Sequence, residues 1–461
     1  MPPPDRPARG KGEAQELPEL SDEQKLRGLP WQLAGNALNS AFANLTVFGS
    51  VFLLFLHELG LPKTQIGMLL SLMPFAGLLA LGFAPVATRL GRRRVFLTCW
   101  TARKFTVAGL LLLPWVMGRF GHAGGLICLT AIVALFAVLR SLAETAWYPW
   151  SQEVVPDRVR GRFGANSTVL ITLASCLALF VAGQVIRRGT GLDGFMVLIA
   201  AGFVFGLLAV AAMLPVPGGA PRPDTESLEG HVGNMRRALR DRNFVLYLAG
   251  FGCVTIGTML YLSFLPLFLK ERLGIAPGTV VTLDTAVMIG GALASLLWGR
   301  TADRFGSRPV LMSASALTLA IPLGWLLLPR QAPHLLPWCA LLYFANGIAL
   351  NGNAIGAGRL LFNGVVPPHE NTAYTALYYA WIGLVGGVAP LVAGGLLQTC
   401  GSWERHYAWL TTDGHALLFA LALLLIGAGW ACYGGVRPDD RYRTRDLIQR
   451  ASTRLLRVLP W

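Results

Sequence analysis

The sequence predicts an all-α membrane protein in which twelve transmembrane helices form two similar six-helix bundles. Of its 461 residues, 54% are hydrophobic and 14% are charged, whereas soluble domains carry about 25% charged residues. Twelve apolar runs are each long enough to cross a bilayer, which takes about 20 residues. Two short motifs of the first half of the chain recur more than 200 residues later, as expected of a duplicated unit.

The chain begins with residues 1–30, which are rich in proline and charge and lack an apolar run, so we expect a disordered tail. The twelve apolar runs then cover residues 33–57, 66–87, 95–117, 124–147, 165–186, 194–214, 244–268, 278–299, 309–329, 337–359, 373–397 and 414–435. A single pass through lipid must satisfy its own backbone hydrogen bonds, which predicts a helix for each run.

Two segments outside the runs complete the expected organisation. Residues 215–243 begin with Pro-Val-Pro-Gly-Gly, which breaks helices, and are expected to link the two halves. Residues 436–461 carry seven arginines and are expected to form a basic tail. The predicted domains are therefore a tail at 1–30, a bundle at 31–214, a linker at 215–243, a bundle at 244–435 and a tail at 436–461.

Lysine and arginine are distributed unevenly between the two sides of the predicted bundles. Of the 39, 28 lie in the tails, linker and loops of one side, eight lie on the other side and three lie within runs. Cytoplasmic segments carry the excess of Lys and Arg, so both termini are expected in the cytoplasm. This topology accounts for most of the net charge of +15 and argues against a nucleic-acid partner.

The strongest motif is the loop between the eighth and ninth runs, which combines Gly299, Asp303, Arg304, Gly306 and Arg308. Residues 84–93 hold a degenerate copy, in which the matching or neighbouring residues are Arg89, Gly91 and Arg92 and Thr88 replaces the aspartate. The glycines of the two copies are 215 residues apart. The tripeptide Val-Val-Pro also recurs, at 154–156 and 365–367. Two unrelated motifs that recur at nearly one spacing indicate two copies of one unit.

The loop at 299–308 has the spacing G-x-x-x-D-R-x-G-x-R between two predicted spans, and on this match the chain resembles the major facilitator superfamily of membrane transporters. The resemblance implies two pseudo-symmetric bundles around a central cavity. Solutes would cross by alternating access, in which the bundles rock about a fixed site. The two loops would close the cytoplasmic side, through Arg89, Gly91, Arg92, Gly299, Asp303, Arg304, Gly306 and Arg308.

Charged residues inside the runs are candidates for function, because each costs about 2.5–3.5 kcal/mol at a helix centre in lipid. Arg140 and Glu144 are four residues apart on the fourth run and can pair on one helix face. The functional interpretation is a substrate-binding Arg140, with Glu144 taking part in proton coupling. The alternative interpretation is a structural ion pair at the mouth of the helix.

Three further charges lie inside runs. Asp284 has no cation three or four residues away, and a poorly solvated carboxyl group favours its protonated form, so Asp284 is a candidate for proton coupling. The alternative is a hydrogen bond between helices. Arg103 and Lys104 are adjacent and cannot share one helix face, so at least one is expected to need its own partner. Their role is left open between the substrate, a structural contact and a lipid phosphate.

Uncharged polar residues on runs 1, 7, 10 and 11 are further candidates, and the resemblance places the first three of these runs, with run 4, at the cavity. The predicted substrate-binding residues, besides Arg140, are Asn39, Asn44, Thr258, Tyr261, Asn346, Asn351 and Tyr378. The alternative is hydrogen bonding between helices, which contributes about 0.6 kcal/mol on average in membranes.

These features predict a secondary active transporter of a small organic solute. A gradient is expected to supply the energy because no ATP-binding motif is present, and the expected coupling ion is the proton. Three cations against two carboxylates inside the runs favour an anionic or amphipathic solute. The alternatives are a multidrug or metabolite exporter, or a transporter-like sensor or lipid-handling protein that moves no solute. No catalytic residue, cofactor or metal is expected.

The remaining expectations concern location and assembly. Arginine outnumbers lysine 34 to 5, and alanine and glycine are abundant, which is typical of GC-rich bacterial genes. We therefore expect a monomer in a bacterial inner membrane, with the lipid bilayer and the solute as its partners.

Overall fold

The computed structural model of the chain describes residues 21–221, 235–329, 334–367, 371–400, 404–407 and 410–439. Most of both expected tails and the middle of the linker therefore lie outside the described residues. The first helix begins earlier than expected, at Asp22, so residues 22–30 are helical rather than part of a tail. Ser21 and Gln24 explain this start, because each accepts a hydrogen bond from the backbone N–H of the other in a capping box.

The first half of the chain makes six passes. Its segments are α1 (Asp22–Thr46), α2 (Gly49–Glu58), α3 (Lys63–Ala76), the 3₁₀ turn η1 (Gly77–Leu79), α4 (Ala80–Leu90), α5 (Arg92–Ala108), η2 (Gly109–Leu112), α6 (Leu113–Val154), α7 (Asp157–Arg188) and α8 (Asp193–Met213). The long α6 contains a reversal at Gly121, where φ is 70°. Its second part runs back along α5, against which it packs.

The second half repeats this pattern. Its segments are α10 (Arg242–Leu262), α11 (Leu265–Glu271), α12 (Pro277–Phe305), α13 (Ser307–Leu327), α14 (Leu335–Leu360), the π-helical η3 (Leu361–Val365), α15 (Asn371–Thr399), β1 (Glu404–Tyr407), β2 (Leu410–Asp413) and α16 (Gly414–Gly435). The antiparallel β1–β2 hairpin was not expected, and it lies between the last two apolar runs rather than within one.

Ten helical segments of the described chain are long and apolar enough to cross a membrane. One of them, residues 92–154, holds two passes because of the reversal at Gly121. The shorter segment at 63–79 continues through α4 and supplies another pass. The described helices therefore provide the twelve expected passes, and the all-α membrane fold is confirmed.

The two halves share their local irregularities as well as their order of helices. The first pass of each half is broken, and a phenylalanine precedes the helix that follows the break. Phe48 is the N-cap residue of α2, and Phe264 is the N-cap residue of α11. Each motif loop turns on a glycine with positive φ, 94° at Gly91 and 85° at Gly306. Only glycine adopts this conformation without steric strain, so the two glycines are needed for the turn. These matches show the duplication in three dimensions.

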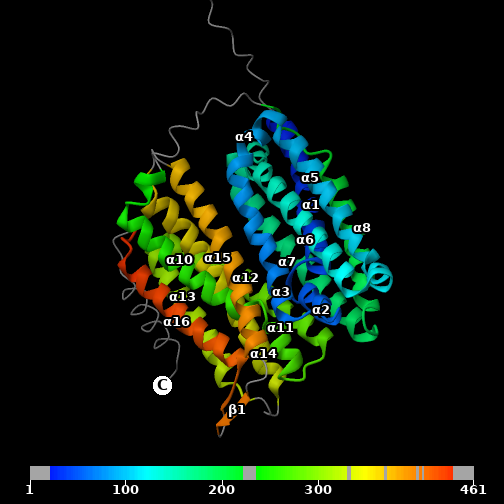
Figure 1. Cartoon of the computed structure of the whole chain (residues 1–461). Helices are drawn as coiled ribbons and strands as arrows, with labels where there is room; N and C mark the ends of the chain where they lie inside the picture. Colours follow the sequence, from blue (N-terminus) through cyan, green and yellow to red (C-terminus); the bar gives the residue numbers. More distant parts are fainter. Residues whose placement is uncertain are drawn as a thin grey trace, which may run out of the picture.

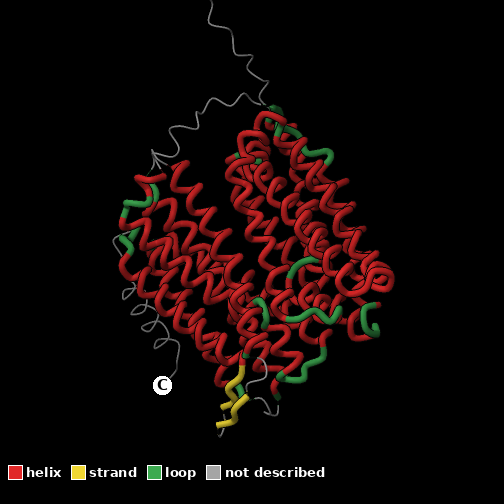
Figure 2. Tube along the Cα trace, in the orientation of Figure 1, coloured by secondary structure: helices red, strands yellow, loops and turns green. Residues whose placement is uncertain are grey.

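Figure 1 shows the halves as two helix bundles, the first in blue and cyan and the second in green to orange. They diverge at the end that carries α4 and the motif loops, which we call the motif end, and meet at the end that carries α2, α11 and the hairpin, which we call the sealed end. Figure 2 shows the same two bundles as almost wholly helical tubes, with the strands only at the sealed end.

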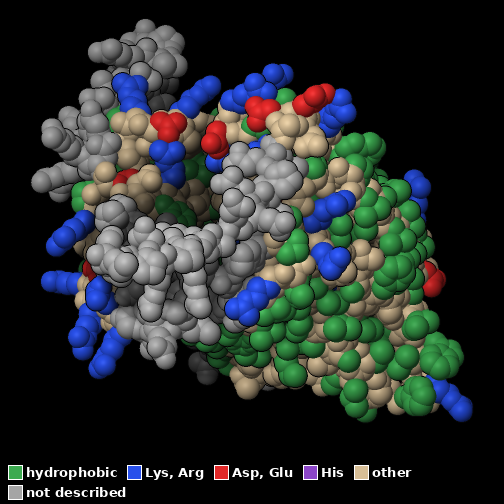
Figure 3. All heavy atoms as spheres, turned by 90° about the horizontal axis from the view of Figure 1, so that it is seen from above, with side chains coloured by type: hydrophobic (Ala, Val, Ile, Leu, Met, Phe, Trp, Pro, Cys, Tyr) green, Lys and Arg blue, Asp and Glu red, His purple; other side chains and the backbone are tan. Residues whose placement is uncertain are grey.

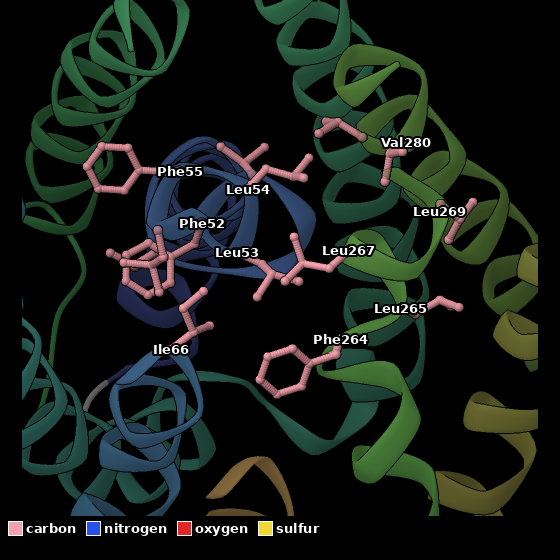
Figure 4. Close-up of a cluster of buried hydrophobic side chains, with 14 of the residues drawn as sticks. Phe52, Leu53, Leu54, Phe55, Ile66, Phe264, Leu265, Leu267, Leu269 and Val280 are labelled. Carbon is pink, nitrogen blue, oxygen red and sulfur yellow. The ribbon is translucent and has the colours of Figure 1, made fainter. Parts of the chain in front are cut away.

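An apolar cluster fills the contact between the halves at the sealed end. Figure 4 shows side chains of α2, including Leu53, directed towards Leu267 and Phe264 of the second half. All three are at most 2% exposed. Because water and polar solutes cannot cross such packed apolar side chains, this cluster closes the sealed end.

Two pairs of helices from opposite halves cross closely at the same end. A Cβ atom on Gly183 of α7 would lie 2.2 Å from Thr282 Oγ1 and 2.5 Å from the Gly278 carbonyl oxygen on α12. A Cβ atom on Gly394 of α15 would lie 2.5 Å from the Lys63 carbonyl oxygen at the start of α3. Small residues allow such backbones to approach, as in other membrane helix pairs. The sealed end therefore depends on glycine at both crossings.

Candidate functional site

A recess opens between the halves at the motif end. Figure 3 looks onto this end and shows the hollow, with Lys and Arg side chains around it. Tyr148 on α6 is 63% exposed and Tyr379 on α15 is 50% exposed, although both lie on membrane helices. Tyr148 belongs to the first half and Tyr379 to the second, so each half carries an exposed tyrosine on a membrane helix. These two side chains are candidates for the aromatic lining of the recess.

Arg140 and Glu144 form the ion pair that their spacing predicts. Arg140 Nε lies 2.7 Å from Glu144 Oε1, and the two side chains are 30% and 45% exposed. The Arg140 guanidinium also lies 4.9 Å from the centre of the Phe48 ring, at the break between α1 and α2. Tyr148 continues the same face of α6, four residues beyond Glu144. This face presents an accessible cation, an accessible carboxylate and an aromatic ring to the recess.

Asn39 does not face the recess as a free ligand. Its Oδ1 atom accepts hydrogen bonds from Arg103 Nη2 at 2.9 Å and from Lys104 Nζ at 2.7 Å. Both cations are buried, at 6% and 0% exposure. The expectation that two adjacent residues could not share a partner was wrong, because the long side chains converge on one atom from different sides of α5. Asn39, Arg103 and Lys104 are called the buried cation cluster below.

Aromatic rings surround the two cations of the buried cation cluster. Lys104 Nζ lies 3.4 Å from the centre of the Phe42 ring and 4.7 Å from that of Trp100. The Arg103 guanidinium lies 5.5 Å from Trp100 and 5.8 Å from Phe136. Such contacts contribute about 2 kcal/mol or more when desolvated. They offset part of the cost of burying two like charges.

Asp284 joins the two halves at the start of α2. Its Oδ2 atom accepts a hydrogen bond of 3.3 Å from the backbone N–H of Ser50. A carboxylate at a helix N-terminus is favoured by the helix dipole and by the unpaired N–H groups there. Since α12 belongs to the second half and α2 to the first, this bond breaks when the halves separate at the sealed end.

Several predicted substrate-binding residues hold helices together within one half. Asn44 Nδ2 donates to the Ser40 carbonyl oxygen at 2.9 Å and to Ser175 Oγ on α7 at 3.1 Å. Tyr261 donates its hydroxyl to Asn346 Oδ1 at 3.1 Å, and both residues are buried. These contacts agree with the alternative interpretation of these polar residues, which is hydrogen bonding between helices.

The other predicted polar residues differ in their surroundings. Thr258 is buried at 3% exposure. Tyr378 is 9% exposed and packs against Phe251, with ring centres 5.2 Å apart. Asn351 is half-buried, and its Oδ1 atom has no hydrogen-bond partner among the described residues. Of this group, Asn351 therefore retains hydrogen-bonding capacity for a ligand.

The described polar contacts of the second motif loop remain within the second half. Asp303 Oδ1 pairs with Arg359 Nη1 of α14 at 2.8 Å. The backbone N–H groups of Ser307 and Arg308, at the start of α13, donate to the Asp439 carboxylate at 3.0–3.3 Å. Arg308 also donates to the Gly434 carbonyl oxygen. Asp303 and Arg308 thus brace their own bundle while the motif end is open.

The first motif loop is braced in a related way. The Arg93 backbone N–H donates to the Gly219 carbonyl oxygen at 3.2 Å, and its Nη2 donates to the Leu214 carbonyl oxygen at 2.5 Å. These acceptors belong to the segment after α8, just as Asp439 follows α16. The predicted gating set is completed by Arg89, Arg92, Gly299 and Arg304. Arg89 and Arg304 are exposed at the motif end, Arg92 is half-buried at the start of α5, and Gly299 has open space around it.

Ion pairs link the two halves at the sealed end. Lys63 Nζ lies 2.6 Å from Glu271 Oε2, and Lys270 Nζ lies 3.2 Å from Glu58 Oε2. His57 Nε2 lies 3.9 Å from Glu271 Oε1. Each half supplies an acid and a base, so the pairs cross the boundary in both directions. We call these five residues the sealed-end latch.

Sequence reasoning missed the latch and the two exposed tyrosines, although signals existed for part of each. Glu58-Leu59-Gly60 and Glu271-Arg272-Leu273-Gly274 end equivalent passes 213 residues apart, close to the spacing of the motif repeats. Tyr148 continues the i, i+4 series from Arg140 and Glu144. Tyr379 had no comparable signal, because its exposure depends on how the helices pack.

Comparison with known proteins gives matches to one family along most of the chain. The family model described as Major Facilitator Superfamily matches residues 36–276 and 247–459. The protein named multidrug resistance protein MdtG of Dickeya zeae (strain Ech586) is 34% identical over 165 residues, which are 34% of this chain and 38% of that protein. MdtG of Enterobacter lignolyticus (strain SCF1) is 30% identical over 190 residues, 39% of this chain and 43% of that protein. These matches thus span less than half of the relatives' length.

Solved structures of similar fold cover almost the whole chain. A bacterial homologue of the iron transporter ferroportin has a TM-score of 0.66 at 12% identity, covering 90% of this chain and 99% of its own. A D-xylose-proton symporter has a TM-score of 0.63 at 16% identity, covering 89% and 98%. At such identities the similarity is one of fold.

Proposed function

The chain belongs to the major facilitator superfamily and is a membrane transporter, and we propose that it is a secondary active transporter of a small organic solute that is anionic or amphipathic. The observation that carries the proposal is the recess between the halves, open at the motif end and closed at the other. Within it, the face of α6 that holds Arg140 and Glu144 offers charge and aromatic contact together.

The proposed mechanism is alternating access between the halves at residues 31–214 and 244–435. With the apolar cluster and the latch closed, solute exchanges between the recess and the side that the motif end faces. After the motif end closes and the sealed end opens, solute exchanges with the opposite side. In the open state, the described polar contacts of each gating loop lie within its own half. When the motif end closes, the two loops form new contacts with each other. Charge pairs suit this role because they form and break without exposing apolar surface.

Proton coupling is assigned to Asp284 and Glu144. Asp284 accepts its hydrogen bond from the opposite half, so its protonation removes an acceptor that favours the closed sealed end. Glu144 lies in the recess and is bonded to Arg140. A carboxyl group whose environment changes with the conformation binds a proton in one state and releases it in the other.

Orientation follows from the charge distribution. We propose that the motif end faces the cytoplasm, with both termini on that side, because the Lys and Arg excess lies there. We propose that the membrane is a bacterial inner membrane and that the transporter works as a monomer. The proposed solute site lies between the two halves of one chain, which supports a monomeric unit.

A proteoliposome assay tests the proposal and its coupling. Purified protein is reconstituted, and entry of naphthalene-2-sulfonate and of its trimethylammonium counterpart is measured by mass spectrometry, with and without a pH gradient. We expect transport of at least one probe to respond to the gradient. Asp284→Asn should abolish that response while exchange at equal pH continues, because the substitution keeps the shape and removes the titration. A sensor or lipid-handling protein would move neither probe, and equal responses in the variant and the wild type would exclude Asp284 as the coupling group.

A multidrug exporter is the second candidate, favoured by the similarity to proteins named multidrug resistance protein MdtG. In this scheme the exposed Tyr148 and Tyr379 line the recess, and aromatic side chains suit flat amphipathic molecules of varied shape. An exporter expels probes from cells, so cells that overproduce the protein should accumulate less of the transported probe than cells that produce Asp284→Asn. Greater accumulation in the overproducing cells would indicate import.

A further inference from the structure

Among the described residues, no carboxylate lies within hydrogen-bonding distance of the buried cation cluster. Arg103 Nη2 and Lys104 Nζ lie 2.9 and 2.7 Å from one amide oxygen, so the two nitrogens are at most about 5.6 Å apart. Both side chains donate to the neutral Asn39, and Arg103 Nε has no partner in the described part of the chain. Two like charges buried so closely repel each other and lose hydration, which is costly unless an anion compensates.

The nearest compensating carboxylate is Glu144 on the neighbouring helix. Arg103 is eleven residues after the start of α5, and Glu144 is ten residues before the end of the antiparallel α6. At 1.5 Å per residue the two lie about 16 and 15 Å from the motif ends of their helices, hence at equal depth. Glu144 and Arg140 are the charged groups that act on Arg103 across this space.

Glu144 is nevertheless bonded to a different cation. Its Oε1 atom accepts the hydrogen bond of Arg140, whose guanidinium is more accessible than that of Arg103. Phe136 lies against Arg103, and Arg140 is one turn further along the same face of α6. Arg103, Lys104 and Arg140 thus place three basic side chains around one carboxylate. The two guanidinium groups alone exceed the single negative charge of Glu144.

Building on the proposed transport function, we propose that the solute carries an oxyanion group that displaces Glu144 from Arg140, and that Arg103 then receives the displaced carboxylate. Arg140 is the solute ligand in this scheme. Arg103 and Lys104 are positioning residues, which make the exchange favourable through their charge. Tyr148 and Tyr379 contact the body of the solute, which is therefore an aromatic or other flat organic anion. The proposal explains why two basic side chains lie at a buried position without a carboxylate beside them.

Two probes that differ in charge test the proposal on the full-length purified protein. Naphthalene-2-sulfonate and naphthalene-2-trimethylammonium share a ring system and keep opposite charges at every working pH. Dissociation constants for both are measured by isothermal titration calorimetry in detergent at low salt. We expect the wild type to bind the sulfonate at least tenfold more tightly than the cation. Preference for the cation, or binding of neither probe, would overturn the proposal.

Substitutions then distinguish an effect of charge on binding from an effect of protein structure. Arg103→Gln and Lys104→Gln should each weaken sulfonate binding about tenfold and leave cation binding unchanged or stronger, because a unit charge acts over this distance. Arg103→Lys should retain sulfonate binding, because it keeps the charge. Arg188→Gln, which removes an exposed cation at the end of α7 and outside the cluster, should change neither constant. Equal weakening of both probes by Arg103→Gln would identify a merely structural role and contradict the proposal.

Glu144→Gln distinguishes displacement from simple support. If Glu144 competes with the solute for Arg140, its removal should strengthen sulfonate binding several-fold; if it only holds Arg140 in place, binding should weaken. Transport is read separately in the proteoliposome assay. Charge-selective binding without transport would refute the proposed function and leave the anion site standing, whereas transport without charge selectivity would refute the anion site alone.

Discussion

Single residues in this chain separate into those that shape the backbone and those that carry charge. Gly91 and Gly306 adopt φ values of 94° and 85° between consecutive helices, and their left-handed backbone sets the direction of α5 and α13. Charged residues need partners instead, and most find them: Asp303 pairs with Arg359, and Arg140 with Glu144. The buried cation cluster differs because its partners are a neutral amide and aromatic rings, which is why we assign it a role in binding.

Gly306→Ala tests the backbone requirement. A Cβ atom at positive φ costs about 1–2 kcal/mol, so the substitution should lower the melting temperature of the purified protein by a few degrees. Gly299→Ala is the matched control, since Gly299 lies within α12 with open space around it and tolerates a methyl group. If both variants melt alike, the positive φ at Gly306 contributes nothing to stability.

At the scale of elements, the breaks and the crossings of helices explain how two bundles close at one end only. Breaking the first pass of each half gives α2 and α11, whose apolar side chains meet in the cluster of Figure 4. The glycine crossings of α3 with α15 and of α7 with α12 bring the same ends of the bundles into contact. At each crossing, backbone atoms of the neighbouring helix occupy the space that a side chain on the glycine would need.

Gly394→Val tests the crossing of α3 and α15. The added side chain meets the Lys63 carbonyl oxygen, because the first carbon alone would lie 2.5 Å from it. The bundles should therefore be held apart at the sealed end, seen as a longer distance between spin labels at residues 61 and 273 in a cysteine-free background. Gly395→Val is the control one residue away, where nothing lies within 4 Å, and it should leave the distance unchanged. Unchanged distances in both variants would show that the crossing does not limit closure.

At the scale of the whole molecule, the chain is two copies of one unit that differ in their charges. The latch pairs an acid and a base from each half, so neither half can form it alone. The motif loops differ too: the second has Asp303 and the first has Thr88. Similar backbones with different charges allow the two ends of the molecule to be held by different contacts, which alternating access requires.

Glu271→Lys tests the latch. It removes the contacts of Glu271 with Lys63 and His57 and adds repulsion, whereas Lys63→Glu with Glu271→Lys restores an ion pair in reverse. The side chains are about a fifth to a third exposed, so each pair contributes only about 0.2–1 kcal/mol. We expect the single variant to shift the population towards the separated sealed end two- to fivefold, measured with the same spin labels, and the double variant to restore it. If the sealed end is separated as often in the double variant as in the single variant, the ion pair between residues 63 and 271 does not hold it closed.

By itself, the sequence determined the twelve passes, the duplication and the membrane class of the protein. A single apolar run in lipid must form a helix to satisfy its backbone hydrogen bonds, and each motif turn requires a glycine. It also determined the Arg140–Glu144 pair, since residues four apart on a helix meet whatever surrounds them. Only the tertiary structure decided the partners of Asn39, Asp284 and Glu271. Their contacts join segments from different helices, and those distances depend on how the bundles pack and not on local periodicity.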